Sequence, residues 1–371
     1  MPDPKPFLTK PDAFVDVSRG DPKPHTLKGD DLVKARLTPE TWRLEILADP
    51  SATLGKQFKL DDNTALDLPA IEDLGKKHGV KFLKAMQCLN IAQPLGQGLW
   101  EGVPLREVLR LVGKVNNVRR VFYHGFHNND PKQIFQSSLG YSQVLETPPW
   151  DLCPFVAYRL NGQPISLKRG GPVRLIVPWA HGFKSIKWLH RITLTNDYKT
   201  NDTYAEKNND PDSYLKTAAY LDDSPQEFKA GTEIFLRGTA MVGWSGLKRV
   251  EYWLRPEAGN HGKLADDDPA WAKAVWTTAT IEPPPTDWGG SLPNGVMPKD
   301  VWGFDETGKP KDWPMRNNYA LWSATLKGLK PGAYEFRVRS VDLNGFAQPE
   351  PRPYPKSGRN EMPVRTIMVM E

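Results

Sequence analysis

Cys88 is the residue whose type and position most directly suggest chemistry. It is one of only two cysteines in the chain and follows a strand-like apolar run, residues 80–86. A thiolate at the end of a strand can act as a soft metal ligand or a nucleophile, which a hydroxyl rarely does. Because free cysteines are often buried, a place in the core is the alternative for Cys88. The second cysteine, Cys153, is flanked by apolar residues and is predicted to lie in a core.

A second group of residues has the chemistry to hold an anion. Arg169 and Arg174 flank an apolar stretch, which leads into a turn that carries Lys184, Ser185 and Lys187. Their cations, the hydroxyl and nearby backbone amides could together bind a phosphate. The turn matches neither GxxxxGKS/T nor GxGxxG, so it is not a known nucleotide loop. A solvated basic turn beside a strand is the alternative.

The elements that position these residues in the first half are predicted from periodicity and turn residues. Strands are predicted at 42–47, 80–86, 119–125, 155–160 and 173–178. A short connection plus one helix is predicted over 66–78, and a second helix at 104–113. The glycines Gly96, Gly98 and Gly102 predict an exposed loop between Cys88 and the second helix. Residues 1–40 are rich in proline and charge and predict an extended arm, and residues 196–224 predict a long loop or linker.

The second half has the pattern of a β-sandwich. Short alternating strands are predicted at 234–238, 250–254, 320–324 and 334–341, with turns between them and an elaborated loop at 259–318. This pattern is typical of an immunoglobulin-like fold. At 371 residues, two domains are expected. The prediction is α+β, with a first domain at 1–215 and a second at 216–371.

Composition excludes several classes of protein. The net charge of +5 is spread without a basic stripe, so we expect no nucleic-acid partner, and small anions suit it better. No apolar stretch is long enough to span a bilayer, and the first residues do not form a secretory leader. Neither CxxC nor CxxCH occurs, so we expect no zinc ribbon and no covalently attached haem.

Several motifs, taken in order, resemble those of the sulfite oxidase family of molybdenum enzymes. They are Cys88, Trp100–Leu109, Ala157–Gly162, Gly171–Arg174 and Lys184–Leu189. Each motif is weak alone, but their order and spacing agree with the family over residues 7–371. The second half, including Gly243–Gly246, is similar to the family's C-terminal dimerisation domain, which is itself immunoglobulin-like.

The resemblance implies a cofactor site with one molybdopterin. Cys88 would supply the protein's thiolate ligand to molybdenum. The implied contacts with the pterin and its phosphate are His127, Arg169, Arg174, Ser185, Lys187 and the backbone of Ile186. In the arm, Arg19 matches an arginine that faces the substrate, whereas Asp21 replaces a cofactor-binding histidine of the family.

The resemblance also implies a tyrosine and a further arginine near the metal. Tyr198, Tyr204 and Tyr214 all follow the Trp188–Leu189 motif, and the spacing favours Tyr214. Arg359 lies where the family returns an arginine to the substrate pocket. An exposed loop arginine is the alternative for Arg359.

One departure from the family affects the substrate. Sulfite oxidases usually carry an arginine five residues after the cysteine, and here that residue is Gln93, which has no charge. Oxidation of a small sulfur compound such as sulfite is the main expectation. The Pro178–Lys184 stretch also resembles the molybdenum subunit of periplasmic methionine sulfoxide reductase, so sulfoxide reduction is an alternative. A non-catalytic β-sandwich binding protein is a second alternative.

The family resemblance extends to partners and compartment. Electrons would leave to an external carrier, with a c-type cytochrome as the expected one, because no haem-binding domain is recognised in the chain. The resemblance also implies a homodimer, and it implies a periplasmic location because such relatives are usually exported folded.

Overall fold

The chain folds into two compact units. The structure, a computed structural model, describes residues 6–91, 93–126, 135–199, 210–222, 225–257, 263–349 and 360–371. The first unit contains Met1–Leu89, Leu95–Ser213 and Thr286–Lys309, and the second contains Asn90–Pro94, Tyr214–Pro285 and Pro310–Glu371. The boundary at Ser213 lies close to the predicted division after residue 215, but residues 286–309 fold with the first unit.

Thr286–Lys309 joins the first unit because its aromatic side chains are buried there. Trp288 packs edge-on against Phe7 and against Phe304, with ring centroids 5.0 and 5.2 Å apart. The backbone N–H of Leu8 also donates to the carbonyl of Trp288 at 2.8 Å. This segment is therefore a packed part of the first unit. The prediction that it belongs to an elaborated loop of the second domain is wrong.

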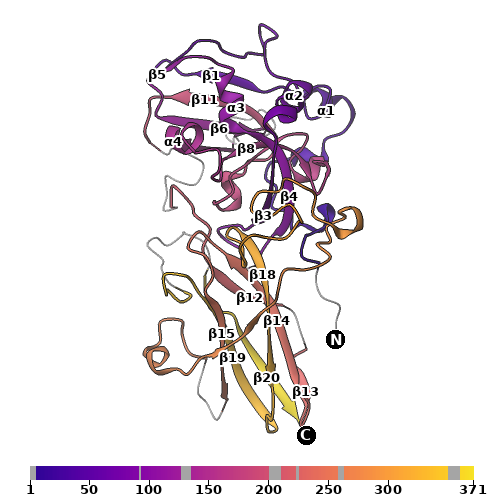
Figure 1. The fold of residues 1–371 in the computed structure, drawn as a ribbon, viewed down its shortest axis with the longest axis vertical. Coiled ribbons are helices and arrows are strands. Elements are labelled where there is room, and N and C mark those ends of the chain that lie inside the picture. The colour runs from indigo at the N-terminus through magenta and orange to yellow at the C-terminus, as the bar shows by residue number, and fades with distance from the viewer. Residues whose placement is uncertain are drawn as a thin grey trace. The chain divides into compact units, whose positions relative to one another are not determined.

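In the described part of the first unit there are three sheets, two of them large. One has the order β1 (Glu45–Ala48), β11 (Leu189–Thr195), β6 (Arg120–Gly125), β7 (Phe135–Gly140). The other has the order β10 (Arg174–Ile176), β8 (Phe155–Leu160), β4 (Gly96–Pro104), β3 (Val80–Met86), with β9 (Gln163–Pro164) beside β8. A small sheet pairs β2 (Thr53–Leu54) with β5 (Val115–Asn116). Figure 1 shows β3 and β4 side by side as the two long strands of the first unit.

The helices of the first unit are short. They are α1 (Gly29–Lys34), α2 (Leu68–His78), α3 (Leu105–Arg110) and α4 (Tyr141–Leu145). Helix α2 lies within the predicted segment 66–78 and begins at Leu68, because the Asp67 side chain caps it by accepting from the N–H of Ala70 at 2.9 Å. Among the described residues, no helix is long and apolar enough to cross a membrane. The arm is not wholly extended as predicted, since α1 lies within it.

The glycine-rich segment after Cys88 is a buried strand, so the predicted exposed loop is wrong. Strand β4 pairs with β3 from Met86↔Gly96 to Val80↔Gly102 and with β8 on its other side. A Cβ at Gly102 would overlap the backbone of Val156 on β8, and one at Gly98 would overlap the side chain of Leu160. These glycines permit close strand packing, whereas sequence reasoning takes glycine as a turn signal.

Gly102→Ala is expected to lower the free energy of unfolding by about 1 to 3 kcal/mol, because the added methyl meets backbone that cannot move aside. Gly140→Ala is the matched control, since its Cβ would meet only the end of the Gln143 side chain at 3.4 Å. Denaturant unfolding measures both. Equal losses in the two variants would show that close packing of β4 is not the cause.

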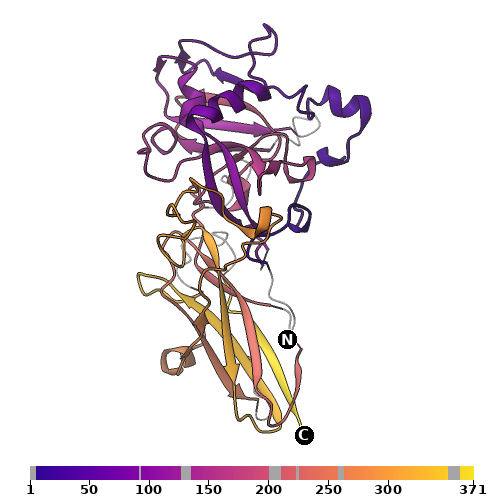
Figure 2. The ribbon, with the colours of Figure 1, turned by 45° about the vertical axis from the view of Figure 1, so that its right-hand side comes forward.

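The second unit consists of two sheets that share one core. One sheet has the order β12 (Ala218–Leu221), β14 (Ile234–Val242), β18 (Asn318–Leu326), β17 (Thr280–Ile281). The other has the order β13 (Glu227–Lys229), β20 (Val364–Met370), β19 (Gly332–Val341), β15 (Arg249–Pro256), β16 (Thr277–Thr278). Leu236 and Trp322 from the first sheet and Phe336 and Ile367 from the second are buried together. Figure 2 shows the long strands of this unit.

The four strands predicted in the second half are confirmed, although β14, β15, β18 and β19 all extend beyond the predicted limits. The predicted loop at 196–224 is wrong at its end, where β12 pairs with β14. The two-sheet arrangement agrees with a sandwich. Its immunoglobulin-like topology stays a prediction.

Candidate functional site

Cys88 lies just beyond the end of β3, in the connection that leads to β4. Its neighbour Gln87 accepts a hydrogen bond from the backbone N–H of Gly182 at 2.8 Å, and the Gln87 amide donates to the Cys88 carbonyl at 3.1 Å. The Cys88 thiol is half-buried and forms no disulfide. The half-buried cysteine is therefore held next to η4, the short 3₁₀ helix Gly182–Lys184.

Several cationic side chains of the same unit are withdrawn from solvent, and they come from separate elements. Lys84 on β3, Arg169 at the end of η3 (Leu167–Arg169), Arg174 at the start of β10 and Lys184 on η4 are buried, and Lys187 before β11 is half-buried. Buried cations need a compensating partner, because removing a charge from water is costly. Their burial indicates a site that binds an anion.

The two arginines hold each other in place. Arg174 donates to the carbonyl of Arg169 at 2.7 Å and to that of Ser185 at 2.5 Å, and it lies over the ring of Trp100. Arg169 donates to the carbonyl of Phe14 at 3.0 Å. Burial, and then the charge of Arg169, lowers the pKa of Arg174 to about 9. An anion bound here would offset both effects.

Some guanidinium nitrogens of these arginines have no partner. The Nε and Nη2 atoms of Arg169 and the Nε atom of Arg174 are buried, and none has a hydrogen bond to the residues that the structure describes. The arginines are only 3% and 5% exposed. Unsatisfied buried donors are rare and costly in proteins. These three atoms are what an anion with several acceptor oxygens would bind.

Ser185 and Ile186 shape the turn between the arginines. The Ser185 Oγ accepts from the N–H of Val177 at 3.0 Å, which leaves its own O–H as a donor. The carbonyl of Ile186 accepts from the N–H of Leu175 at 3.0 Å. Ser185 is therefore placed as a neutral donor next to the guanidinium of Arg174, whereas Ile186 ties the turn to β10.

Lys187 binds the N-terminal arm. Its Nζ lies 3.2 Å from Oδ1 of Asp16, 2.6 Å from Oγ of Ser18 and 3.0 Å from the carbonyl of Lys168. Burial and the charge of Arg174 lower the pKa of Lys187 to about 7, although Asp16 opposes the shift. The ammonium is therefore close to losing its proton near neutral pH.

The affinity of the cofactor-free chain for sulfate is expected to fall about tenfold between pH 6 and pH 8, since Lys187 loses its proton near pH 7. Sulfate suits this titration because its own charge is constant in that range. Calorimetric titration measures the affinity. In Lys187→Met the affinity should be lower and nearly independent of pH, and a persisting tenfold fall would assign the effect to another group.

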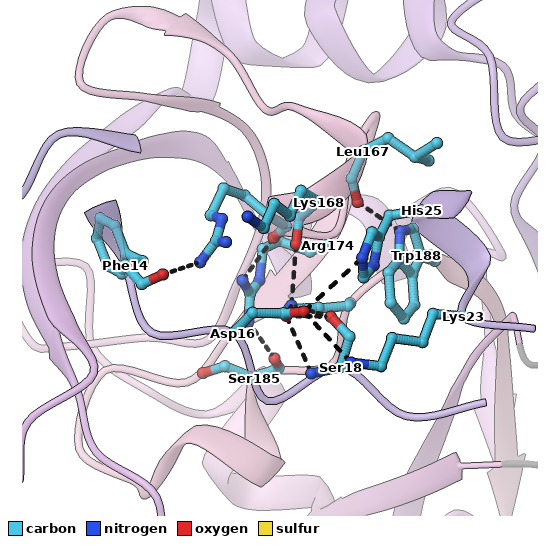
Figure 3. A network of polar contacts seen from close by, with 12 residues as sticks. Phe14, Asp16, Ser18, Lys23, His25, Leu167, Lys168, Arg174, Ser185 and Trp188 are labelled. Atoms are coloured by element: carbon cyan, nitrogen blue, oxygen red, sulfur yellow. Dashed lines mark hydrogen bonds and ion pairs between the residues drawn. The ribbon is translucent and has the colours of Figure 1, made fainter. Parts of the chain in front are cut away.

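Sequence reasoning missed the part of the arm that packs here. The Nε2 of His25 lies 3.7 Å from Oδ2 of Asp16, and the His25 ring stacks on Trp188. Figure 3 shows the arm residues gathered around Asp16. Burial raises the pKa of Asp16, but hydrogen bonds from Ser18 and the charge of Lys187 outweigh it and hold the pKa well below its usual range. The sequence signal that could have found this part of the arm is His25, four residues after Asp21, the residue that stands where the family has a histidine.

The two arm residues singled out from the sequence are exposed. Arg19 lies over the ring of Phe135 at 5.4 Å from its centroid, and Asp21 is exposed in the turn that follows. The arm residues that contact Lys187 are Asp16 and Ser18.

The remaining predicted site residues fall into two groups. Tyr214 belongs to the second unit, where its ring packs on Trp244 with centroids 4.9 Å apart, and Tyr198 is 68% exposed. The other three lie outside the described residues: His127, Tyr204 and Arg359. Gln93, the uncharged residue in place of the family's arginine, is exposed.

Lys84 is a buried cation that sequence reasoning did not single out. It is fully buried on β3, and its Nζ donates to the carbonyls of Pro178 and Ala180 at 2.8 Å each. Burial, and then the charge of Arg174, lowers the pKa of Lys84 well below its ordinary value. Lys84 therefore ties β3, the strand that leads to Cys88, to the loop that precedes η4.

Cys153 lies in the core, as predicted. It is 8% exposed, and burial raises the pKa of its thiol to about 11. A thiol that stays protonated is a poor ligand and a poor nucleophile. The structure thus separates the two cysteines by environment.

Comparison with known proteins identifies the domain that carries the site. Residues 32–203 match the family described as oxidoreductase molybdopterin binding domain. Mitochondrial sulfite oxidase of Drosophila melanogaster is 26% identical over 179 residues, which cover 46% of this chain and 30% of that protein. Inducible NADH nitrate reductase 2 of Glycine max is 34% identical over 114 residues, which cover 30% of this chain and 13% of that protein. The chain thus spans less than a third of the length of these relatives.

A solved structure has a similar fold along most of the chain. The sulfane dehydrogenase SoxCD from Paracoccus pantotrophus aligns with a TM-score of 0.57 at 16% identity, covering 94% of this chain and 86% of that one. The match supports the arrangement of strands described above.

The residues in the site fit a molybdopterin group. Its phosphate would meet the partnerless nitrogens of Arg169 and Arg174, and its metal would meet a soft, half-accessible thiol at Cys88. Both requirements are supplied by residues inside the matched segment 32–203. The arm residues that close on Lys187 lie outside it.

Proposed function

Because residues 32–203 are a molybdopterin-binding oxidoreductase domain of the sulfite oxidase family, we propose that the chain oxidises a small sulfur compound such as sulfite by oxygen-atom transfer and passes the electrons to an external carrier. When bound, the cofactor supplies a metal that exchanges two electrons and one oxygen atom with the substrate. The observation that carries the proposal is the half-accessible Cys88 thiol in the same unit as buried arginines with partnerless nitrogens.

In this proposal different residues bind the metal and the pterin. Cys88 is the protein's ligand to the metal. Arg169, Arg174 and Ser185 hold the anionic end of a single pterin by charge-assisted hydrogen bonds, with Ile186 fixing the turn. His127 is a further cofactor contact from the resemblance alone.

The substrate side of the proposal comes from the family resemblance. By that resemblance Arg19 and Arg359 would orient an anionic sulfur compound, and Tyr214 would assist proton movement. The SoxCD structure is named as a sulfane dehydrogenase, which supports a sulfur compound as substrate. Each charge-assisted bond to an oxyanion contributes about 1.5 to 3 kcal/mol, so the arginines favour an anion over a neutral molecule.

Sulfoxide reduction is a second candidate, and one observation favours it. Gln93 stands where the family has an arginine in the anion pocket, and it is uncharged. A pocket with one fewer cation holds a doubly charged oxyanion less tightly and suits a neutral sulfoxide better.

Two assays on molybdenum-loaded protein separate the candidates. Sulfite with an artificial electron acceptor tests oxidation, and methionine sulfoxide with a reduced viologen tests reduction. Turnover of sulfite at the higher kcat/KM supports the proposal, and turnover of the sulfoxide alone assigns the opposite direction. Absence of both activities in fully loaded protein would favour a non-catalytic binding protein.

The proposal extends to the partner, the assembly and the compartment. The electron acceptor is a c-type cytochrome, since the proposed cofactor set contains molybdopterin and no haem. The chain forms a homodimer through its second unit and works in the periplasm. Sedimentation analysis of the loaded protein tests the dimer, and reduction of cytochrome c with sulfite as donor tests the acceptor.

A further inference from the structure

Lys187 has every N–H engaged by groups that the structure describes. An ammonium group carries three donors. In Lys187 they face Oδ1 of Asp16, Oγ of Ser18 and the carbonyl of Lys168. An anion that binds Lys187 must therefore take the place of one of these acceptors.

Asp16 is the acceptor that an anion would replace. It alone of the three carries a negative charge, so an anion at Lys187 repels Asp16 and does not repel Ser18 or Lys168. Its contact with Lys187 is also the longest, at 3.2 Å. The two remaining acceptors are neutral and can stay on the ammonium.

Asp16 keeps partners of its own when it leaves Lys187. The backbone N–H and the hydroxyl of Ser18 donate to its Oδ1 at 3.0 and 2.5 Å. Lys23 lies 3.9 Å and His25 3.7 Å from its Oδ2. Lys23 and His25 lie on the arm with Asp16, so Asp16 keeps these partners when its contact with Lys187 breaks, and the Ser18 hydroxyl can stay between Asp16 and Lys187.

We propose that Asp16 is a resident counter-anion of Lys187, which an anionic ligand must displace in order to bind. The inference rests on the proposed function only for the ligand's identity as the cofactor phosphate. While the site holds no ligand, Asp16 compensates the half-buried ammonium. Asp16 also weakens the binding of small anions, because an anion must break the contact between Asp16 and Lys187. A ligand that also binds the partnerless nitrogens of Arg169 and Arg174 compensates for that lost contact.

The other charges around Lys187 do not replace Asp16. Arg174 and Arg169 are cations and make the site more positive, and Lys23 lies against Asp16 itself. His25 is also in contact with Asp16, and burial keeps its pKa below the ordinary value. Asp16 is thus the one carboxylate among the described residues in direct contact with Lys187.

The test is calorimetric titration of the full-length chain, purified from a host that cannot make molybdopterin, with sulfate alone at about pH 6. At this pH Lys187 is charged. Asp16→Asn is expected to bind sulfate about tenfold more tightly than the original chain. Asp30→Asn removes the same charge from an exposed position on α1 and is expected to change the affinity less than twofold.

A double variant shows whether the effect runs through Lys187. In a Lys187→Met background, Asp16→Asn should no longer improve sulfate binding, because the contact it relieves is gone. Circular dichroism confirms that each variant is folded. Unchanged or weaker sulfate binding in Asp16→Asn, or an equal gain in the Lys187→Met background, would overturn the inference.

The outcome is separable from that of the proposed function. Tighter sulfate binding in Asp16→Asn supports the counter-anion even if protein from a competent host carries no molybdenum. Loaded, active protein combined with unchanged sulfate affinity in Asp16→Asn removes the counter-anion and leaves the proposed function standing.

Discussion

Cys88→Ser is expected to lower turnover by about a thousandfold or more, because a serine hydroxyl is neither soft nor ionised at neutral pH and cannot replace a thiolate on the metal. Cys88 is the half-accessible thiol of the pair, at the end of β3 and beside η4. The loss should appear in kcat with little change in stability, since the position is not in the packed core. Steady-state assays and thermal unfolding measure the two effects.

Cys153→Ser is the matched control for this substitution. The Cys153 thiol is buried and its pKa is about 11, so it is expected to contribute packing and no chemistry. Its replacement should cost some stability and leave most of the activity. Equal losses of activity in the two variants would refute the assignment of roles to the two thiols.

Arg174→Met is expected to reduce the cofactor content of purified protein more than tenfold, because one side chain both binds the anion and supports the turn. The guanidinium donates to the carbonyls of Arg169 and Ser185, so its loss leaves two buried acceptors without partners. It also removes one of the two buried cations that have partnerless nitrogens. Metal analysis and the fluorescence of the released, oxidised pterin measure the content.

Two companion variants make the result specific. Arg174→Lys keeps the charge but lacks the planar fork that reaches two carbonyls, so an intermediate loss is expected. Arg159→Met on β8 removes a half-exposed arginine whose nearest carboxylate, on Glu72, is 3.8 Å away, and should leave the content unchanged. Full cofactor content in Arg174→Met would contradict the anion site.

The regular parts of the fold could be predicted from local pattern. The apolar run at 80–86 is β3, and the helix predicted within 66–78 is α2. The glycines of β4 misled the prediction, because the same residue that breaks a strand in isolation permits close packing between two others. A glycine that ends a strand and a glycine that permits close packing look the same in the sequence. They differ only in whether a second neighbouring strand, here β8, pairs with the strand that carries them.

The candidate site was predictable only where residues lie close in sequence. Arg169, Arg174 and Ser185 come from one stretch and are brought together as expected. Asp16 meets Lys187 across 171 positions, and Lys84 meets Ala180 across 96. Contacts of this range depend on how β3, β10 and the arm pack, and no local pattern encodes them.

The central claim is that this chain holds molybdenum on one pterin through Cys88, and the molybdenum content of the purified chain tests it most directly. The chain should be produced in a host that makes molybdopterin and compared with Cys88→Ser from the same host. We predict about one molybdenum per chain, because a metal held by both a thiolate and an anchored organic ligand survives purification. Less than about a tenth of an equivalent in the original chain would contradict the account.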